Sequence, residues 1–272
     1  MRGSSITLED YTLEEALRIF KDAGCTSIEM WKHHLKRCKT EELRQKFVSY
    51  AKGLGISMGG LNVVGEDYFE PFGSDAQLQQ TLDGLKADTD FALSLGTRDV
   101  LIWEGRAPFG TKESHWMETC LPRLVDLFRE ALTYMVPRQA RLLVEPHPFT
   151  VGMSDKLLVK LCDSLDSAHF GVTFDFCHYG VGRPTDYVDA VRVLGPRIRN
   201  IHFSDSDQRT SELHFPPNAG RLKINALLDA FKSIHYEGTI ALDLYGYPLP
   251  VQALPAAVER LREACNFLGL KG

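Results

Sequence analysis

The chain has 272 residues, with 31 Lys and Arg against 36 Asp and Glu, so its formal net charge is −5 at pH 7. A hydrophobic content of 44% with 25% charged residues is typical of a packed globular protein and excludes disordered, collagen-like and coiled-coil chains. The length fits either two ordinary domains or one α/β barrel of roughly 250 residues.

Composition also bears on partners and location. A protein that holds nucleic acid by its phosphates needs a basic surface, whereas the one dense basic run, KHHLKR at 32–37, is short, so we expect no nucleic-acid partner. No run of about 18 apolar residues occurs, and the N-terminus lacks the apolar block of a signal peptide. We therefore expect a cytoplasmic location and no membrane partner. Six cysteines without a CxxC pair indicate reduced thiols, with neither a zinc ribbon nor a redox motif.

Short β-type apolar runs alternate with longer amphipathic segments along the whole chain, which predicts βα units around a parallel sheet. In chain order, strands are expected at 5–7, 27–31, 57–62, 99–104, 141–145, 170–175, 198–202 and 239–243. Helices are expected at 12–22, 40–54, 76–95, 114–135, 154–166, 186–194, 224–234 and 253–268. A capping-box pattern at Thr40 is expected to begin the second helix.

Eight strands and eight helices predict a single (β/α)8 TIM barrel, in class α/β, as one domain over residues 1–272. An open doubly wound sheet is the alternative. A nucleotide-binding version of that fold would need a glycine-rich turn after an early strand, and the chain contains no GxGxxG, GxxxxGKS or GxxxxGKT. The barrel is therefore the better interpretation.

Each of the last four expected strands ends in a side chain that can bind a metal ion: Glu145, Asp175, His202 and Asp243. The C-terminal ends of barrel strands converge on one mouth, so these four side chains should lie together. Three carboxylates and one imidazole suit Mn²⁺, Co²⁺, Mg²⁺ or Zn²⁺, and among these we expect Mn²⁺. The sequence predicts one divalent metal ion at the mouth.

Other polar and aromatic residues near strand ends are candidates for substrate contacts. These are Trp31, His34, Asn62, Glu104 and His147. Each also has a structural interpretation. Glu104 could be an outer group that supports the metal ligands without touching the ion, or it could form a salt bridge with Arg106. His147 could orient the loop after the fifth strand.

Five sequence blocks resemble the xylose isomerase-like TIM barrels, a family of sugar isomerases, 3-epimerases, inosose dehydratases and hydroxypyruvate isomerase that also includes endonuclease IV. The blocks are TLEEALRIFKDAGCTSIEMW, LLVEPHP, FDFCHYG, IRNIHFSDSD with the later HFPPNAGRLKI, and GTIALDLYGY, and they span nearly the whole chain in the family's order. The resemblance implies that the four strand-end residues bind the metal ion and that His178 and Arg209 contact substrate. It also implies that Glu145 and Asp243 are the acid/base pair, although Glu is usual at position 243 and the shorter Asp has less reach.

The implied activity is that of an enzyme on a small sugar or polyol. A divalent cation polarises a carbonyl so that Glu145 can remove the neighbouring proton, giving an enediolate. Returning the proton elsewhere isomerises or epimerises the sugar, whereas expelling a β-substituent makes the protein a lyase or dehydratase of a keto-sugar or inosose. No phosphate-binding loop is present, which favours an unphosphorylated substrate. The family also includes paired barrels, so a homo-oligomer is compatible with the resemblance.

Two other functions stay open from the sequence. The first is a phosphodiesterase like endonuclease IV, in which Glu212 and His214 would bind a further metal ion. Endonuclease IV has His ligands at strand ends three and four, where this chain has Asn62 and Trp103-Glu104. The second is a catalytically inactive barrel subunit.

Overall fold

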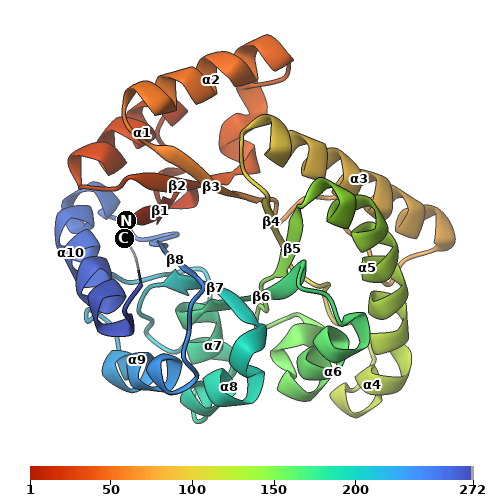
Figure 1. Ribbon diagram of the computed structural model, residues 1–272. Coiled ribbons are helices and arrows are strands. Elements are labelled where there is room, and N and C mark those ends of the chain that lie inside the picture. Colours follow the sequence, from red (N-terminus) through yellow and green to blue (C-terminus); the bar gives the residue numbers. More distant parts are fainter. Residues whose placement is uncertain (271–272) are drawn as a thin grey trace.

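The computed structural model describes residues 1–270, and its eight parallel strands close into a barrel (Figure 1). Each strand pairs with the next along the chain, and β8 pairs with β1. The predicted (β/α)8 TIM barrel is confirmed. The strands are β1 Arg2–Ser4, β2 Ser27–Trp31, β3 Ser57–Asn62, β4 Asp99–Ile102, β5 Arg141–Val144, β6 Phe170–Asp175, β7 Ile198–Phe203 and β8 Thr239–Leu242.

The helices lie outside the ring of strands (Figure 1). They are α1 Leu13–Asp22, α2 Glu41–Gly53, α3 Asp75–Ser94, α4 Trp116–Thr119, α5 Leu121–Met135, α6 Asp155–Leu165, α7 Phe176–Gly182, α8 Tyr187–Leu194, α9 Ile224–Ser233 and α10 Pro250–Leu268. Among the described residues, no helix combines the length and apolar character needed to cross a membrane. The six cysteines are free thiols.

The first strand and the fourth predicted helix differ from expectation. A strand at 5–7 is wrong, because β1 ends at Ser4 and Ser5–Leu8 form a 3-10 turn. Side chains of this turn bond other strand ends, since the Ser5 hydroxyl accepts the N–H of Trp31 at 2.7 Å and the Thr7 hydroxyl accepts the N–H of Leu244 at 2.9 Å. The helix expected at 114–135 is divided into α4 and α5, because Pro122 lacks the N–H that a continuous helix would need there.

Helix starts show a second set of differences. The capping box expected at Thr40 is wrong: the Thr40 hydroxyl accepts the N–H of Leu43, but leucine cannot bond back. Reciprocal capping boxes instead begin α1, through Thr12 and Glu15, and α3, through Ser74 and Gln77. Helix α7, directly after β6, was not predicted.

A cluster of buried aromatic rings packs behind the carboxyl ends of β6 and β7. The ring of Phe174 on β6 stacks on Tyr179 of α7 with centroids 3.9 Å apart, and Phe176 stacks on Phe231 of α9 at 5.8 Å. All four rings are fully buried. They fix α7 and α9 against the barrel, and so fix the strand ends that carry the candidate ligands.

Gly246 provides a test of the turn after β8. Its φ is +68°, and a Cβ at this position would overlap the carbonyl oxygen of Glu212 in the loop after β7. Gly110 has a similar φ of +79°, but a Cβ there would have no neighbouring atom within 4 Å. Gly110→Ala should therefore cost only the strain of a positive φ, about 1–2 kcal/mol.

We expect Gly246→Ala to lower the free energy of unfolding by at least twice as much as Gly110→Ala, measured by urea denaturation. Equal losses of unfolding free energy in the two variants would show that the close approach of Gly246 to Glu212 does not contribute to stability.

Candidate metal centre

The carboxyl ends of β5 to β8 bring the four predicted ligands together at one end of the barrel. Nδ1 of His202 lies 2.5 Å from Oε1 of Glu145. The same nitrogen lies 3.6 Å from Oδ2 of Asp175 and 3.6 Å from Oδ2 of Asp243. All four side chains are buried. Their oxygen and nitrogen atoms thus surround a single small region.

Backbone N–H groups orient two of the carboxylates. Oδ1 of Asp175 accepts the N–H of His178 at 2.7 Å, which caps α7, and Oδ1 of Asp243 accepts the N–H of Tyr245 at 3.0 Å. In both residues Oδ2 is the oxygen that faces His202. Oδ2 of Asp175 is buried and has no hydrogen-bond partner among the described residues.

His202 has a carboxylate on each side of its ring. Nε2 lies 2.9 Å from Oε1 of Glu29, opposite the contact between Nδ1 and Glu145. Ionised carboxylates only accept hydrogen bonds, so when Glu29 and Glu145 are both ionised the two ring nitrogens carry protons and the ring is positively charged. Burial opposes this charge, but Glu145 and Glu29 together raise the pKa of His202 well above its usual value. A cation bound at Nδ1 would take the place of that proton.

Glu29 was missed by the sequence analysis. It lies in the middle of β2, is completely buried, and also accepts a hydrogen bond at 3.2 Å from Nδ2 of Asn200 on β7. A carboxylate that bonds the outer nitrogen of a metal-binding histidine fixes the ring's orientation. The available signal was an acidic residue between Ile28 and Met30, inside a strand rather than at its end.

Two further histidines face the same carboxylates. Nδ1 of His214 lies 3.7 Å from Oδ2 of Asp175 and 3.6 Å from Oδ1 of Asp243. Nδ1 of His178 lies 3.9 Å from Oε1 of Glu145, and burial lowers the pKa of His178 to about 3, so this ring is neutral. Both Nδ1 atoms are buried without a hydrogen-bond partner among the described residues. The donor atoms therefore fit a cation on either side of Asp175, with His202 or with the pair His178 and His214.

A cavity of about 120 Å³ opens over this centre. Of the predicted substrate contacts, Trp31, Asn62 and His178 line it, and Glu145 and Asp243 reach its wall. Oδ1 of Asn62 accepts the N–H of Val64 at 3.0 Å, which leaves its amide NH₂ group to donate. Glu212, His214 and Tyr245 complete the polar lining.

His147 and Glu104 lie behind the cavity wall. Nε2 of His147 is 2.7 Å from Oε1 of Glu212, so Glu212 is turned toward His147. Oε1 of Glu104 accepts the N–H of Gly152 at 2.5 Å, and burial raises the pKa of Glu104 to about 7. No ion pair joins Glu104 and Arg106 within the described residues. Neither side chain lines the cavity: Glu104 supports the loop at Gly152, and His147 is bonded to Glu212.

His34 and Arg209 also lie outside the cavity. His34 lies in the 3-10 turn Lys32–Arg37 and does not line the cavity, and its Nε2 lies 3.3 Å from the carbonyl oxygen of Glu9. Oδ1 of Asp207 accepts the N–H groups of Arg209 and Thr210, both at 2.8 Å, and Arg209 is exposed. Neither side chain lines the cavity, and their contact with substrate stays a prediction.

Comparison with known proteins places this geometry in context. A family model described as "Xylose isomerase-like TIM barrel" matches residues 17–268. An uncharacterized protein of Methanocaldococcus jannaschii is 27% identical over 94 residues, which cover 34% of this chain and 32% of that protein. The chain therefore aligns with only about a third of the length of this curated relative.

Two solved structures share the fold. A D-tagatose 3-epimerase-like protein superposes with a TM-score of 0.79 at 17% identity, covering 98% of this chain and 97% of the other. The IOLI protein, solved with a binding zinc atom, superposes with a TM-score of 0.75 at 16% identity, with the same coverage of each chain.

From the contact between Glu29 and His202 we predict how removal of the buried Glu29 carboxylate changes stability. Breaking a buried ion pair by removing one partner costs about 3–5 kcal/mol. We expect Glu29→Leu to lower the free energy of unfolding by about this amount at neutral pH, measured by urea denaturation. Glu29→Gln keeps an oxygen that can accept from Nε2 of His202 and should lose less than half as much. A Glu29→Leu variant as stable as the wild type would contradict the interaction.

Proposed function

Because the chain belongs to the xylose isomerase-like TIM barrel family, we propose that it is a divalent-metal-dependent sugar isomerase or epimerase. In this reaction a proton is removed next to a carbonyl and an enediolate is formed. The observation that carries the proposal is the convergence of four buried side chains: carboxylate oxygens of Glu145, Asp175 and Asp243 lie within 3.6 Å of Nδ1 of His202. Oδ2 of Asp175 is buried without a hydrogen-bond partner among the described residues. Such atoms are rare and destabilising, so this arrangement supports a cation at this position in the working protein.

The residues proposed to hold the ion are Glu145, Asp175, His202 and Asp243. Three carboxylates and an imidazole suit Mn²⁺, which we propose first, with Co²⁺, Mg²⁺ or Zn²⁺ as alternatives. When bound, the ion would polarise the substrate carbonyl and stabilise the negative charge that develops on its oxygen. The fold shared with the zinc-containing IOLI protein supports a metal-binding role.

Glu145 is the proposed base. It reaches the cavity wall from the end of β5. Burial raises the pKa of Glu145 to about 7, although His202 acts in the opposite direction. A cation bound beside Glu145 would lower this pKa, and the ionised carboxylate could then accept a proton from carbon. Trp31, Asn62 and His178 are the proposed substrate contacts, because they line the same cavity.

Asp243 is proposed as the second acid/base group, and its geometry also favours an alternative reaction. One of its oxygens accepts the N–H of Tyr245 and the other faces His202, so a short side chain is held on the metal side of the cavity. Epimerisation needs a proton donor on the opposite face of the substrate carbon, whereas in a syn elimination one group can remove the proton next to the carbonyl and pass it to the departing hydroxyl, which leaves as water. A lyase or dehydratase acting on a keto-sugar or inosose is therefore the second candidate.

The metal proposal predicts the composition of the purified protein. Protein prepared without chelator should contain about one divalent ion per chain by mass spectrometry, and Mn²⁺ at 100 times its Kd should raise the free energy of unfolding by about 2.7 kcal/mol. Asp175→Asn should lose both the ion and this stabilisation. Asp126→Asn, which changes a carboxylate exposed on α5, should lose neither. Absence of an ion, together with no stabilisation by any of the four metals, would contradict the proposal.

The proposal for Glu145 predicts the loss of proton exchange. With Mn²⁺ and a panel of ketoses, inososes and 3-keto-glycosides in D₂O, the wild type should exchange a proton next to the carbonyl. Glu145→Gln should reduce the rate by about 10²–10⁴, the usual contribution of a general base. The exposed Glu130→Gln on α5 is the matched control. If Glu145→Gln folds normally and retains exchange, Glu145 is not the base.

A further inference from the structure

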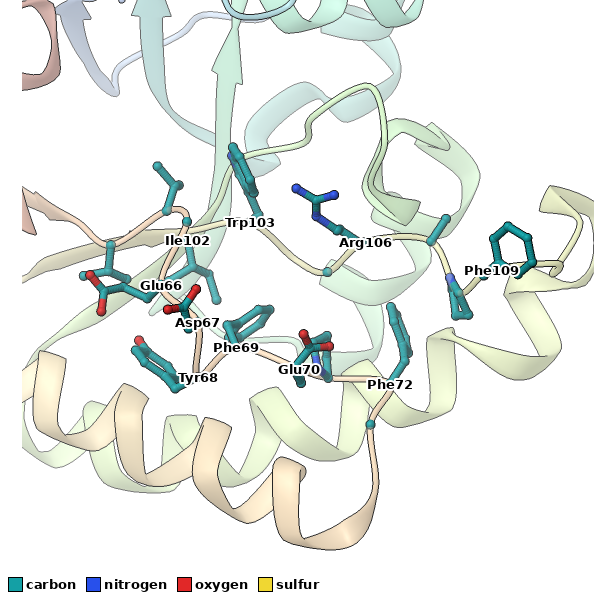
Figure 2. A pocket seen from close by; sticks show the side chains of 18 residues that line it. Glu66, Asp67, Tyr68, Phe69, Glu70, Phe72, Ile102, Trp103, Arg106 and Phe109 are labelled. Carbon is teal, nitrogen blue, oxygen red and sulfur yellow. The ribbon is translucent and has the colours of Figure 1, made fainter. Parts of the chain in front are cut away.

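A second, larger cavity adjoins the metal centre on one side. It has a volume of about 460 Å³ and lies between the loops that follow β3 and β4 (Figure 2). We call it the outer groove, and define it by residues 63–73 and by 102, 103 and 105–109. Val64, Gly65 and Trp103 line both this groove and the 120 Å³ cavity. The two spaces therefore share a wall.

The two volumes differ in what they can hold. Ligand sites in proteins usually measure about 300–1,000 Å³. The inner cavity lies below this range and the outer groove lies within it. A ligand that occupied both spaces would have one part at the metal centre and a second, larger part outside the barrel.

Aromatic rings line both sides of the outer groove. Figure 2 shows Trp103 and Arg106 along the loop after β4, with Phe69 and Phe72 facing them from the loop after β3. Trp103, Phe69 and Phe72 are half-buried, and Phe109 is completely exposed. Packing against the hydrophobic core explains in part why Phe69 and Phe72 are aromatic. It does not explain the completely exposed ring of Phe109. Faces of aromatic rings pack well against the flat faces of other rings.

The charges of the outer groove limit the ligand. Its lining carries the carboxylates of Glu66, Asp67 and Glu70 against the single guanidinium of Arg106. Glu66 forms an ion pair with Lys32 at 3.1 Å. Arg106, whose guanidinium lies 4.3 Å from the ring centroid of Phe149, makes no ion pair within the described residues. With Glu66 paired to Lys32, the lining leaves Asp67 and Glu70 against Arg106. This excess of one negative charge disfavours phosphates and carboxylates, while the same groups can hydrogen-bond hydroxyls of a neutral ligand.

We infer that the substrate is an uncharged glycoside, with its reacting sugar ring at the metal centre and a second ring in the outer groove. The inference rests on the proposed function for the position of the reacting ring. Phe72 and Phe109 flank the second ring, and Glu70 and Arg106 offer hydrogen bonds to its hydroxyl groups. A free monosaccharide would leave the larger of the two spaces unused.

A kinetic comparison tests this substrate class. With Mn²⁺ in D₂O, phenyl 3-keto-glucoside should undergo proton exchange with a kcat/KM at least tenfold higher than 3-keto-glucose. Phe72→Ala and the fully exposed Phe109→Ala should each reduce that ratio about fivefold. Phe267→Ala, which truncates an exposed ring on α10, should leave it unchanged. Equal values for the two substrates, or a ratio unchanged in both groove variants, would overturn the inference.

A binding measurement separates this inference from the proposed function. Phenyl β-glucoside has no keto group, so its binding measured by calorimetry does not depend on the reaction. Saturable binding that Phe72→Ala and Phe109→Ala weaken at least fivefold supports the groove even if no sugar exchanges a proton, in which case the proposed function alone fails. Absence of binding, or binding unaffected by both variants, overturns the inference even if free keto-sugars react.

The charge of the second ring is tested in the same assay. The carboxylates of the groove should make 4-carboxyphenyl β-glucoside bind more weakly than phenyl β-glucoside at neutral pH, and raising the salt concentration should reduce the difference. Equal or tighter binding of the carboxylated probe would overturn the requirement for an uncharged second ring.

Discussion

His202, held between Glu29 and Glu145, makes the contacts on which the buried cluster at the strand ends depends. Four carboxylates, from β2 and from the ends of β5, β6 and β8, are buried at one end of the barrel, and such a concentration of negative charge is unstable without a positive charge among them. β2 and β7 are not neighbours in the barrel, so the bond from Glu29 to His202 crosses its interior. Closing the strands into a ring therefore brings the four carboxylates together and also places His202 among them.

The loops around the mouth fall into two groups. On the metal side they bond one another: His147 reaches Glu212, and the N–H of His214 donates to the carbonyl oxygen of Tyr245 at 2.9 Å. Gly246 permits the turn after β8 to approach the loop after β7. On the other side the loops after β3 and β4 meet where Pro71 and Phe72 pack against Gly105, and the outer groove lies between the remaining parts of these loops. One half of the mouth thus holds the candidate metal ligands in a fixed arrangement, and the other half leaves room beside them.

The sequence predicts the barrel well because its apolar runs and helical stripes repeat eight times, and it predicts where Asp175 and Asp243 lie because strand ends converge. It predicts side-chain direction poorly. His34 lies in a 3-10 turn and Arg209 lies in a loop where Asp207 accepts its N–H, and neither side chain lines the cavity. Glu29 was overlooked because its partner His202 is 173 residues away, and only the closed barrel brings the two together. The outer groove lies between the loops after β3 and β4, and no local sequence pattern predicts how these two loops are placed relative to each other.

One edge of the groove is already fixed without a ligand. Arg106 and Thr150 form an antiparallel bridge, the N–H of Ala107 donates to the carbonyl oxygen of Phe149 at 3.1 Å, and Glu104 holds Gly152. Because these hydrogen bonds hold the wall in place, it loses little conformational entropy when a ligand binds. More of the contact energy therefore contributes to affinity. Discrimination between similar ligands should then appear mainly in how long each one stays bound.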